Sequence, residues 1–281
     1  MKPRNLHTKI FLDSGIPVET KEMLELLTFL DGQTTNPSLM AKNPVLSGKK
    51  FSESELYATY QEIASEISHL IPQGSVSLEV YADKDTSYEQ MLEEGRKLNQ
   101  WIPNAHIKLP ITEVGLKVAR TLVDEGINVN MTLCFTQEQA AAVYQATAGA
   151  KRGQVYVSPF IGRLEDIGLS GMSLVFNIEQ MYREEGDGHV MVLAASIRSL
   201  EHVMLCLSRN IDIITSGPGV YKTWAEQGCV VPDETYQHIT ERETILYRSG
   251  LLSQSDLNIQ HDLTDAGLQR FADDWNNLLK S

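Results

Sequence analysis

The chain has 281 residues, about the length that an eightfold α/β barrel uses as a single unit. Hydrophobic residues make up 42% of it, and its 19 glycines and 10 prolines are too few for a disordered or collagen-like chain. The 24 basic and 37 acidic residues give a net charge of −13, which disfavours a surface that tracks nucleic-acid phosphates. An anionic ligand would therefore need a local group of basic side chains.

Eight strand-like segments recur along the chain with helical stretches between them, the order expected of parallel βα units. We expect strands at residues 9–13, 27–36, 75–82, 105–110, 127–135, 155–160, 189–196 and 211–215. This pattern predicts one (β/α)8 TIM barrel domain over residues 1–281, with a C-terminal helix at about 264–280. A doubly wound open sheet is the alternative, although it usually has fewer strands at this length.

Several of these segments alternate apolar and polar side chains. Val76 and Leu78 alternate with Ser77 and Glu79, and residues 128–133 follow the same pattern. In an antiparallel sheet the polar face would meet solvent, whereas in a barrel covered by helices it points inward. Active sites of such barrels lie at the C-terminal ends of the strands. We expect six polar side chains there: Asp13, Glu79, Lys108, Thr132, Ser158 and Arg198.

Lys108 is the residue with the most distinctive chemistry on this inferred inner face. It lies between Ile107 and Leu109, just before the end of the segment. Most lysines in strands are exposed, but an amine withdrawn from water favours its neutral form, which can attack a carbonyl. The resulting iminium would stabilise a carbanion on the next carbon, and Asp13 and Glu79 could move the protons.

Five motifs carry a family resemblance. Residues 31–38 (DGQTTNPS) look like the transaldolase signature at the second strand, and residues 107–110 (IKLP) with Gly115 resemble the signature around its Schiff-base lysine. The resemblance continues through residues 128–135 (NVNMTLCF), 157–163 (VSPFIGR) and 195–199 (ASIRS). The chain therefore resembles the transaldolase family, which is related to the fructose-6-phosphate aldolase-like group, over roughly residues 9–200.

The resemblance implies catalytic roles for four residues. Lys108 would form the Schiff base, and Asp13 would handle the hydroxyl proton during C–C cleavage. Glu79 and Thr132 would hold a water that relays protons while the imine forms and breaks. The seven residues implied for substrate binding are Asn36, Asn130, Ser158, Phe160, Arg163, Ser196 and Arg198. Of these, Arg163 and Arg198 would bind the sugar phosphate.

The resemblance also implies an activity. A transaldolase transfers a dihydroxyacetone unit from a ketose phosphate, such as sedoheptulose 7-phosphate or fructose 6-phosphate, to an aldose phosphate. Related aldolases tend to carry Gln at the position of Glu79 and Tyr at that of Phe160, so this chain has the transaldolase choice at both. The N-terminal segment has no apolar stretch typical of a signal peptide, so we expect a cytoplasmic protein, and the resemblance implies an enzyme of carbohydrate metabolism in the pentose phosphate pathway. It needs no cofactor or metal, and it has small-molecule sugar phosphates as partners, without nucleic acid or membrane.

Other interpretations stay open at this point. The chain could be a lyase that cleaves fructose 6-phosphate or a modified sugar, or a sugar-phosphate binding protein without activity. Asp13 and Asn36 could serve as helix caps, and Arg163 and Arg198 could belong to surface salt bridges. Glu79 could be a buried ion-pair partner of Lys108. A homo-oligomer is equally open.

Overall fold

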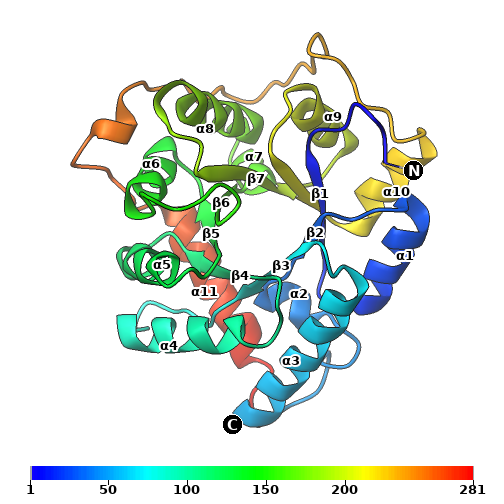
Figure 1. Cartoon of the computed structure of the whole chain (residues 1–281), viewed down its shortest axis with the longest axis vertical. Helices are drawn as coiled ribbons and strands as arrows, with labels where there is room; N and C mark the ends of the chain where they lie inside the picture. Colours follow the sequence, from blue (N-terminus) through cyan, green and yellow to red (C-terminus); the bar gives the residue numbers. More distant parts are fainter. Residues whose placement is uncertain (1, 281) are drawn as a thin grey trace.

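The computed structural model describes residues 2–280, which form one closed barrel of parallel strands (Figure 1). The strands are β1 (Lys9–Asp13), β2 (Gly32–Thr34), β3 (Ser75–Glu79), β4 (Ala105–Pro110), β5 (Val129–Cys134), β6 (Val155–Pro159), β7 (Val190–Ile197) and β8 (Ile213–Ser216). Each strand pairs with the next, and β8 pairs with β1 to close the barrel. The prediction of a (β/α)8 barrel is thus confirmed, and the open sheet is wrong.

Helices surround the barrel in Figure 1. They are α1 (Pro17–Leu27), α2 (Pro37–Ala41), α3 (Glu53–Leu70), α4 (Tyr88–Asn99), α5 (Glu113–Asp124), α6 (Gln137–Ala146), α7 (Ile161–Glu165), α8 (Gly171–Glu185), α9 (Leu200–Ser208), α10 (Pro218–Glu226) and α11 (Asp262–Asn276), with a short 3-10 helix at Leu251–Ser253. Residues with hydroxyl side chains cap the N-termini of several of these helices. The hydroxyl oxygen accepts a hydrogen bond from a backbone N–H group in the first turn that has no partner within the helix. Ser52 caps α3 and Ser87 caps α4 in this way.

Two expected elements have different bounds in the structure. The segment expected as a strand over residues 27–36 contributes only three residues to β2, because Leu27 still belongs to α1 and Thr28 ends that helix in the left-handed conformation, with φ of 67°. The helix expected at about 264–280 is α11, which begins at Asp262 and ends at Asn276. The apolar residues at the start of this segment thus led to the prediction of a strand, whereas in the structure α1 ends there and a turn leads into β2.

The apolar faces of the strands pack outward against the helices. Ile107 and Leu109 of β4 are fully buried, and Gly95 of α4 lets that helix approach Ile107 and Leu122. A second close approach fixes the end of β4: a Cβ on Gly115 would lie 2.0 Å from the carbonyl oxygen of Pro110. Glycine at this position therefore allows α5 to begin directly beside the strand that carries Lys108.

Helix α11 lies across the C-terminal end of the barrel, beside α2 and behind the strands in Figure 1. Thr264 anchors it by donating a hydrogen bond to the carbonyl of Leu133, at 3.0 Å. Gln139 of α6 donates to Thr264 Oγ1 at 2.8 Å. Of the helices in residues 2–280, none combines the length and the apolar character needed to cross a bilayer.

The fold generates a prediction about acid stability. His106 lies at the opposite end of the barrel, stacked on Tyr156 with ring centroids 4.2 Å apart, and bonded to Ser75 and Gly153. Burial lowers its pKa from the ordinary 6.5 to about 4, so below pH 6.5 the unfolded chain binds a proton that the folded chain does not. The free energy of unfolding should therefore decrease as the pH drops from about 6.5 to about 4, by up to about 3 kcal/mol from this group.

Urea titrations across this pH range measure the effect. His106→Gln should flatten the slope of stability against pH, although its stability at pH 7 can be lower. The matched control is His7→Gln, which removes an exposed histidine and should leave the slope unchanged. An identical slope in the native chain and His106→Gln would contradict the assignment.

Candidate active site

A cavity of about 240 Å³ opens between the C-terminal ends of the strands and α11. Its lining joins charged, hydroxyl and apolar side chains: Asp13, Thr34, Asn36, Ser38, Leu39, Lys42, Lys108, Ser158, Phe160, Arg163, Leu193, Ala195, Ser196, Thr215, Arg270 and Phe271. Most of the site residues predicted from the sequence are in this lining. The predicted residues outside it are Glu79, Asn130, Thr132 and Arg198.

Lys108 is held inside the barrel by Glu79. The two residues face each other across β3 and β4, and Lys108 Nζ donates to Glu79 Oε2 at 2.8 Å. A second bond from Nζ reaches the carbonyl of Thr35 at 3.2 Å, and the ring of Phe271 lies 5.7 Å from the ammonium. Burial raises the pKa of Glu79, while the positive charge of Lys108 opposes that rise. Glu79 therefore holds a proton more readily than an exposed carboxylate does.

A chain of hydroxyl groups fixes Asp13 on the other side of the cavity. Thr34 Oγ1 donates to Asp13 Oδ1 at 2.6 Å, and Thr215 Oγ1 lies 2.6 Å from Thr34 Oγ1. Because each hydroxyl has one hydrogen, Thr215 must donate to Thr34 when Thr34 donates to Asp13. Burial raises the pKa of Asp13, and Lys108 and the Thr34 bond partly offset it. The carboxyl group thus has a raised affinity for a proton.

Asn130 and Thr132 belong to β5, where they are in register with Lys108 and Pro110 of β4. Asn130 Nδ2 donates to Ser77 Oγ at 3.0 Å, and Ser158 Oγ donates to Asn130 Oδ1 at 2.6 Å. Thr132 is fully buried, yet its hydroxyl forms no hydrogen bond with any part of residues 2–280. A buried hydroxyl without a protein partner is a place where a water or a reacting group can bind.

Three basic side chains meet at the opening of the cavity: Lys42 from the end of α2, Arg163 from α7 and Arg270 from α11. The pKa of Arg163 is lowered by burial and by the neighbouring positive charges of Arg270 and Arg198. Positive charges gathered around Arg163 in this way favour an anion between them. The arrangement therefore fits a phosphate group.

Arg198 has a different environment from the other arginines. It forms a two-bond ion pair with Asp166, beside α7, and its side chain packs over Gly162. The surface salt bridge that the sequence left open thus exists for Arg198, whereas Arg163 lines the cavity.

Asn36 and Asp13 differ in their relation to the helices that follow them. Asn36 caps α2, because its side chain accepts a bond from the N–H of Leu39, and it also lines the cavity. Asp13 does not cap α1, which begins after Ile16. A capping role therefore accounts for part of the environment of Asn36 and for none of that of Asp13.

Ser196 and Phe160 line the cavity at the ends of β7 and β6. Ser196 has φ of 56°, a left-handed conformation that costs energy in a residue with a side chain, and the register of β7 with β8 shifts around it. Phe160 presents a mostly buried apolar ring, packed edge-to-face against Phe135 at 5.8 Å between centroids. The cavity thus has no hydroxyl at the position of Phe160.

Sequence reasoning missed Lys42, Arg270, Phe271, Thr34 and Thr215 in this site. Thr34 belongs to the recognised second-strand motif, so that motif was the available signal for it. Lys42 and Arg270 reach the cavity from helices, and strand alternation carries no information about them. Over residues 2–280 the acidic, histidine and cysteine side chains form no group of three that could hold a metal ion.

The cavity lining provides an amine, the carboxyl group of Asp13 and a basic anion site, and the carboxyl group of Glu79 is hydrogen-bonded to the amine. These groups can form an imine with a carbonyl compound, move protons on its hydroxyls and bind a phosphate at its far end.

A model of the family described as "Transaldolase/Fructose-6-phosphate aldolase" matches residues 10–281. A "Probable transaldolase" of Cereibacter sphaeroides (strain ATCC 17025 / ATH 2.4.3) is 38% identical over 267 residues, which cover 95% of each chain. Another "Probable transaldolase", of Anaeromyxobacter dehalogenans (strain 2CP-C), is 35% identical over 273 residues, covering 97% of this chain and 99% of that protein.

Among solved structures, a "putative dehydratase" from Mesorhizobium loti matches with a TM-score of 0.50 and 10% sequence identity. The match covers 76% of this chain and 56% of that one, so this chain spans little more than half of its length. At this identity the likeness concerns the fold alone.

The site yields a prediction about the stability of two variants. Thr132→Val removes a hydroxyl that the protein leaves unpaired, so it should not lower the free energy of unfolding. Ser158→Ala removes the bond to Asn130 Oδ1 and should lower that free energy by about 1–3 kcal/mol. Chemical denaturation measures both variants. If Thr132→Val lowers the free energy of unfolding more than Ser158→Ala does, this interpretation of the two hydroxyls is wrong.

Proposed function

The chain belongs to the transaldolase/fructose-6-phosphate aldolase family of enzymes, and we propose that it transfers a dihydroxyacetone unit between sugar phosphates through an imine at Lys108. The donor would be a ketose phosphate, such as sedoheptulose 7-phosphate or fructose 6-phosphate, and the acceptor an aldose phosphate. The observation that carries the proposal is the buried Lys108 amine, paired with Glu79 at 2.8 Å and lining the same cavity as Asp13.

The reaction begins when Glu79 takes a proton from the Lys108 ammonium, which leaves a neutral amine beside the ketose carbonyl. The amine adds to the carbonyl carbon, and loss of water gives an iminium. Glu79 and the Thr132 hydroxyl would hold the water that carries protons in these steps. No charge has to leave the barrel, because the proton moves within a hydrogen-bonded pair.

Asp13 then removes the proton from the hydroxyl on the carbon β to the iminium carbon. The C–C bond breaks, the aldehyde leaves, and the electron pair of the broken bond moves into the iminium to form an enamine. Attack of the enamine on an acceptor aldehyde forms the new C–C bond, and Asp13 returns the proton to the new alkoxide. Hydrolysis of the iminium releases the product and regenerates the amine.

The remaining residues would hold the substrate. Asn36 and Ser158 would bind hydroxyls of the three-carbon unit, while Asn130 and Ser196 complete that end of the site. Phe160 supports transfer over simple cleavage, because it offers no hydroxyl that could orient water toward the enamine.

The phosphate would lie at the basic opening of the cavity. Arg163, Lys42 and Arg270 line this opening together. Arg198, which the family resemblance assigns to the same phosphate, would have to leave Asp166 in the complex.

Borohydride trapping tests the imine. Reduction in the presence of fructose 6-phosphate should attach a three-carbon adduct to the peptide that contains Lys108, because hydride reduces the iminium to a stable amine. Lys108→Arg keeps the positive charge but stays protonated, and it should be inactive and unlabelled. Mass spectrometry of the digested protein locates the adduct. Labelling at another lysine, or turnover by Lys108→Arg, would contradict the mechanism.

Phosphate recognition gives a separate prediction. Arg163→Ala should lower kcat/KM for fructose 6-phosphate roughly 10- to 150-fold, since a charge-assisted hydrogen bond contributes about 1.5–3 kcal/mol. Arg198→Ala should lower kcat/KM less, because Arg198 must break its ion pair with Asp166 before it can bind the phosphate. For unphosphorylated fructose, kcat/KM should decrease far less in both variants. Thermal melts show whether the variants are folded. Equal losses for both sugars would show that the arginines do not bind phosphate.

A further inference from the structure

Tyr60 of α3 is a buried residue to which the proposed reaction assigns no role. It does not line the cavity that contains Lys108. Its hydroxyl nevertheless accepts a hydrogen bond from the backbone N–H of Glu79, at 3.0 Å. Because the side chain of the same glutamate accepts a bond from Lys108, one residue connects Tyr60 with the reacting amine.

The Tyr60 hydroxyl has a second partner, Thr35 Oγ1, at 3.3 Å. Thr35 Oγ1 uses its one hydrogen to donate to the carbonyl of Ser77 at 2.8 Å, so Tyr60 is the donor to Thr35. The carbonyl of Thr35 accepts the second bond of Lys108 Nζ, at 3.2 Å. The two residues that accept bonds from Lys108 Nζ, Glu79 and Thr35, are thus both bonded to one tyrosine hydroxyl.

The position and the protonation of the Tyr60 hydroxyl are both fixed. Its ring packs edge-to-face against Trp101 and Trp275, with ring centroids 5.3 and 5.7 Å away. Burial raises the pKa of Tyr60 above its ordinary value of 10, and the nearby charge of Glu79 adds to this rise. The hydroxyl therefore keeps its hydrogen at neutral pH, so it can hold neighbouring groups but cannot act as a base.

We propose that Tyr60 is a positioning residue for imine formation, an inference that rests on the proposed transfer through Lys108. Its hydroxyl keeps Glu79 and Thr35 at a fixed separation, so that the amine between them points to the carboxyl group that takes its proton. Without the hydroxyl, the buried N–H of Glu79 has no partner, and the end of β3 must shift to find one. The shift would reach Lys108 through the Glu79 side chain and slow the transfer of the proton.

Tyr57 provides a matched control on the same helix. Its ring also packs edge-to-face against Trp101 and Trp275, with ring centroids 6.2 and 5.4 Å away. Its hydroxyl donates to Glu94 Oε1 at 2.7 Å. Among the hydrogen bonds of residues 2–280, none joins Tyr57 to the partners of Lys108. Loss of this hydroxyl therefore removes a similar bond without affecting the amine.

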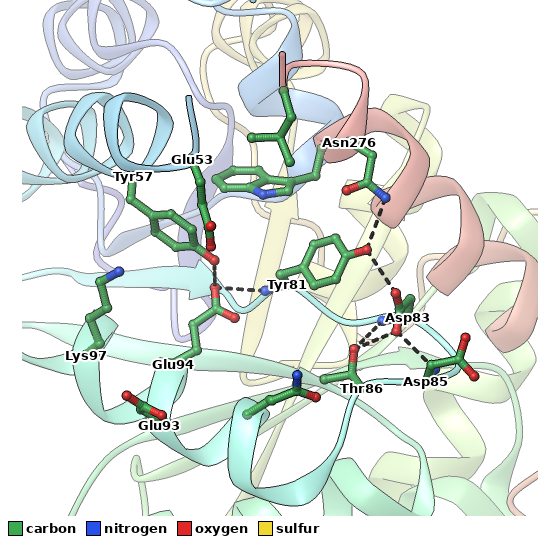
Figure 2. A pocket seen from close by; sticks show the side chains of 13 residues that line it. Glu53, Tyr57, Tyr81, Asp83, Asp85, Thr86, Glu93, Glu94, Lys97 and Asn276 are labelled. Atoms are coloured by element: carbon green, nitrogen blue, oxygen red, sulfur yellow. Dashed lines mark hydrogen bonds between the residues drawn. The ribbon is translucent and has the colours of Figure 1, made fainter. Parts of the chain in front are cut away.

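The bond between Tyr57 and Glu94 lies in a second cavity, of about 580 Å³, between α3, α4, α11 and the loop after β3 (Figure 2). Tyr81 and several acidic side chains also line this cavity. Of residues 2–280, none lines both this cavity and the one that contains Lys108. The two tyrosines of α3 thus serve different surroundings.

Timed borohydride trapping tests the proposal in the whole chain. Enzyme and fructose 6-phosphate are mixed and quenched with borohydride at increasing times, and mass spectrometry follows the adduct on Lys108. Tyr60→Phe should form the adduct roughly 10- to 100-fold more slowly than the native chain, because small displacements of reacting groups have large effects on rate. The sugar concentration that gives half the maximal trapping rate should change by less than about twofold, since other groups bind the phosphate. Tyr57→Phe should form the adduct at the native rate.

Equal trapping rates in Tyr60→Phe and the native chain would overturn the positioning role, as would equal slowing by Tyr60→Phe and Tyr57→Phe. If the native chain itself forms no adduct, the proposed function fails and this inference fails with it. Thermal melts show whether Tyr60→Phe is folded. If it is not, Thr35→Val provides the same test, because it removes the hydroxyl to which Tyr60 donates and should also slow trapping. Trapping at the native rate by a folded Thr35→Val would then contradict the proposal.

Discussion

The ion pair of Lys108 and Glu79 inside the barrel is the interaction on which the candidate site depends. Both side chains are about 4% exposed, and withdrawing two charges from water costs several kcal/mol per ion. Apolar side chains of similar volume would be at least as stable there, so stability does not explain the pair. The barrel holds it because β3 and β4 bring the two residues into register, and because the backbone carbonyl of Thr35 accepts a second bond from Lys108.

Helix α11 gives this pair its enclosure. Phe271 lies over the Lys108 ammonium, and Arg270, on the same turn, adds a positive charge to the cavity opening. One turn further along, Trp275 packs against Tyr60, whose hydroxyl accepts the backbone N–H of Glu79 at 3.0 Å. The same helix thus covers the lysine, contributes to the anion site and supports the strand that carries the glutamate. Its anchoring at Thr264 therefore affects all three.

Local pattern accounts for what the sequence predicted well. Alternation along β3 and β5 identified the inward side chains, and the order of strands and helices predicted the closed barrel, which is confirmed, as is the family. The local sequence pattern does not predict contacts between segments that are distant in the chain. Thr215 meets Thr34 only because β8 closes onto β1, and Arg270 reaches the cavity only because α11 folds back across the barrel. Helical periodicity gives the apolar face of α11 but not the surface against which it packs.

The distribution of charge between the two cavities resolves an apparent conflict with the overall composition. A net charge of −13 repels anionic sugar phosphates at long range, yet salt screens that repulsion beyond about 8 Å. At the small cavity, Lys42, Arg163 and Arg270 place positive charge within that distance of a bound phosphate. The acidic excess collects elsewhere, and the cavity beside Tyr81 is one such place. Because Arg270 and Phe271 of α11 line the small cavity and Trp275 and Asn276 of the same helix line the acidic one, the two sets of charges lie apart.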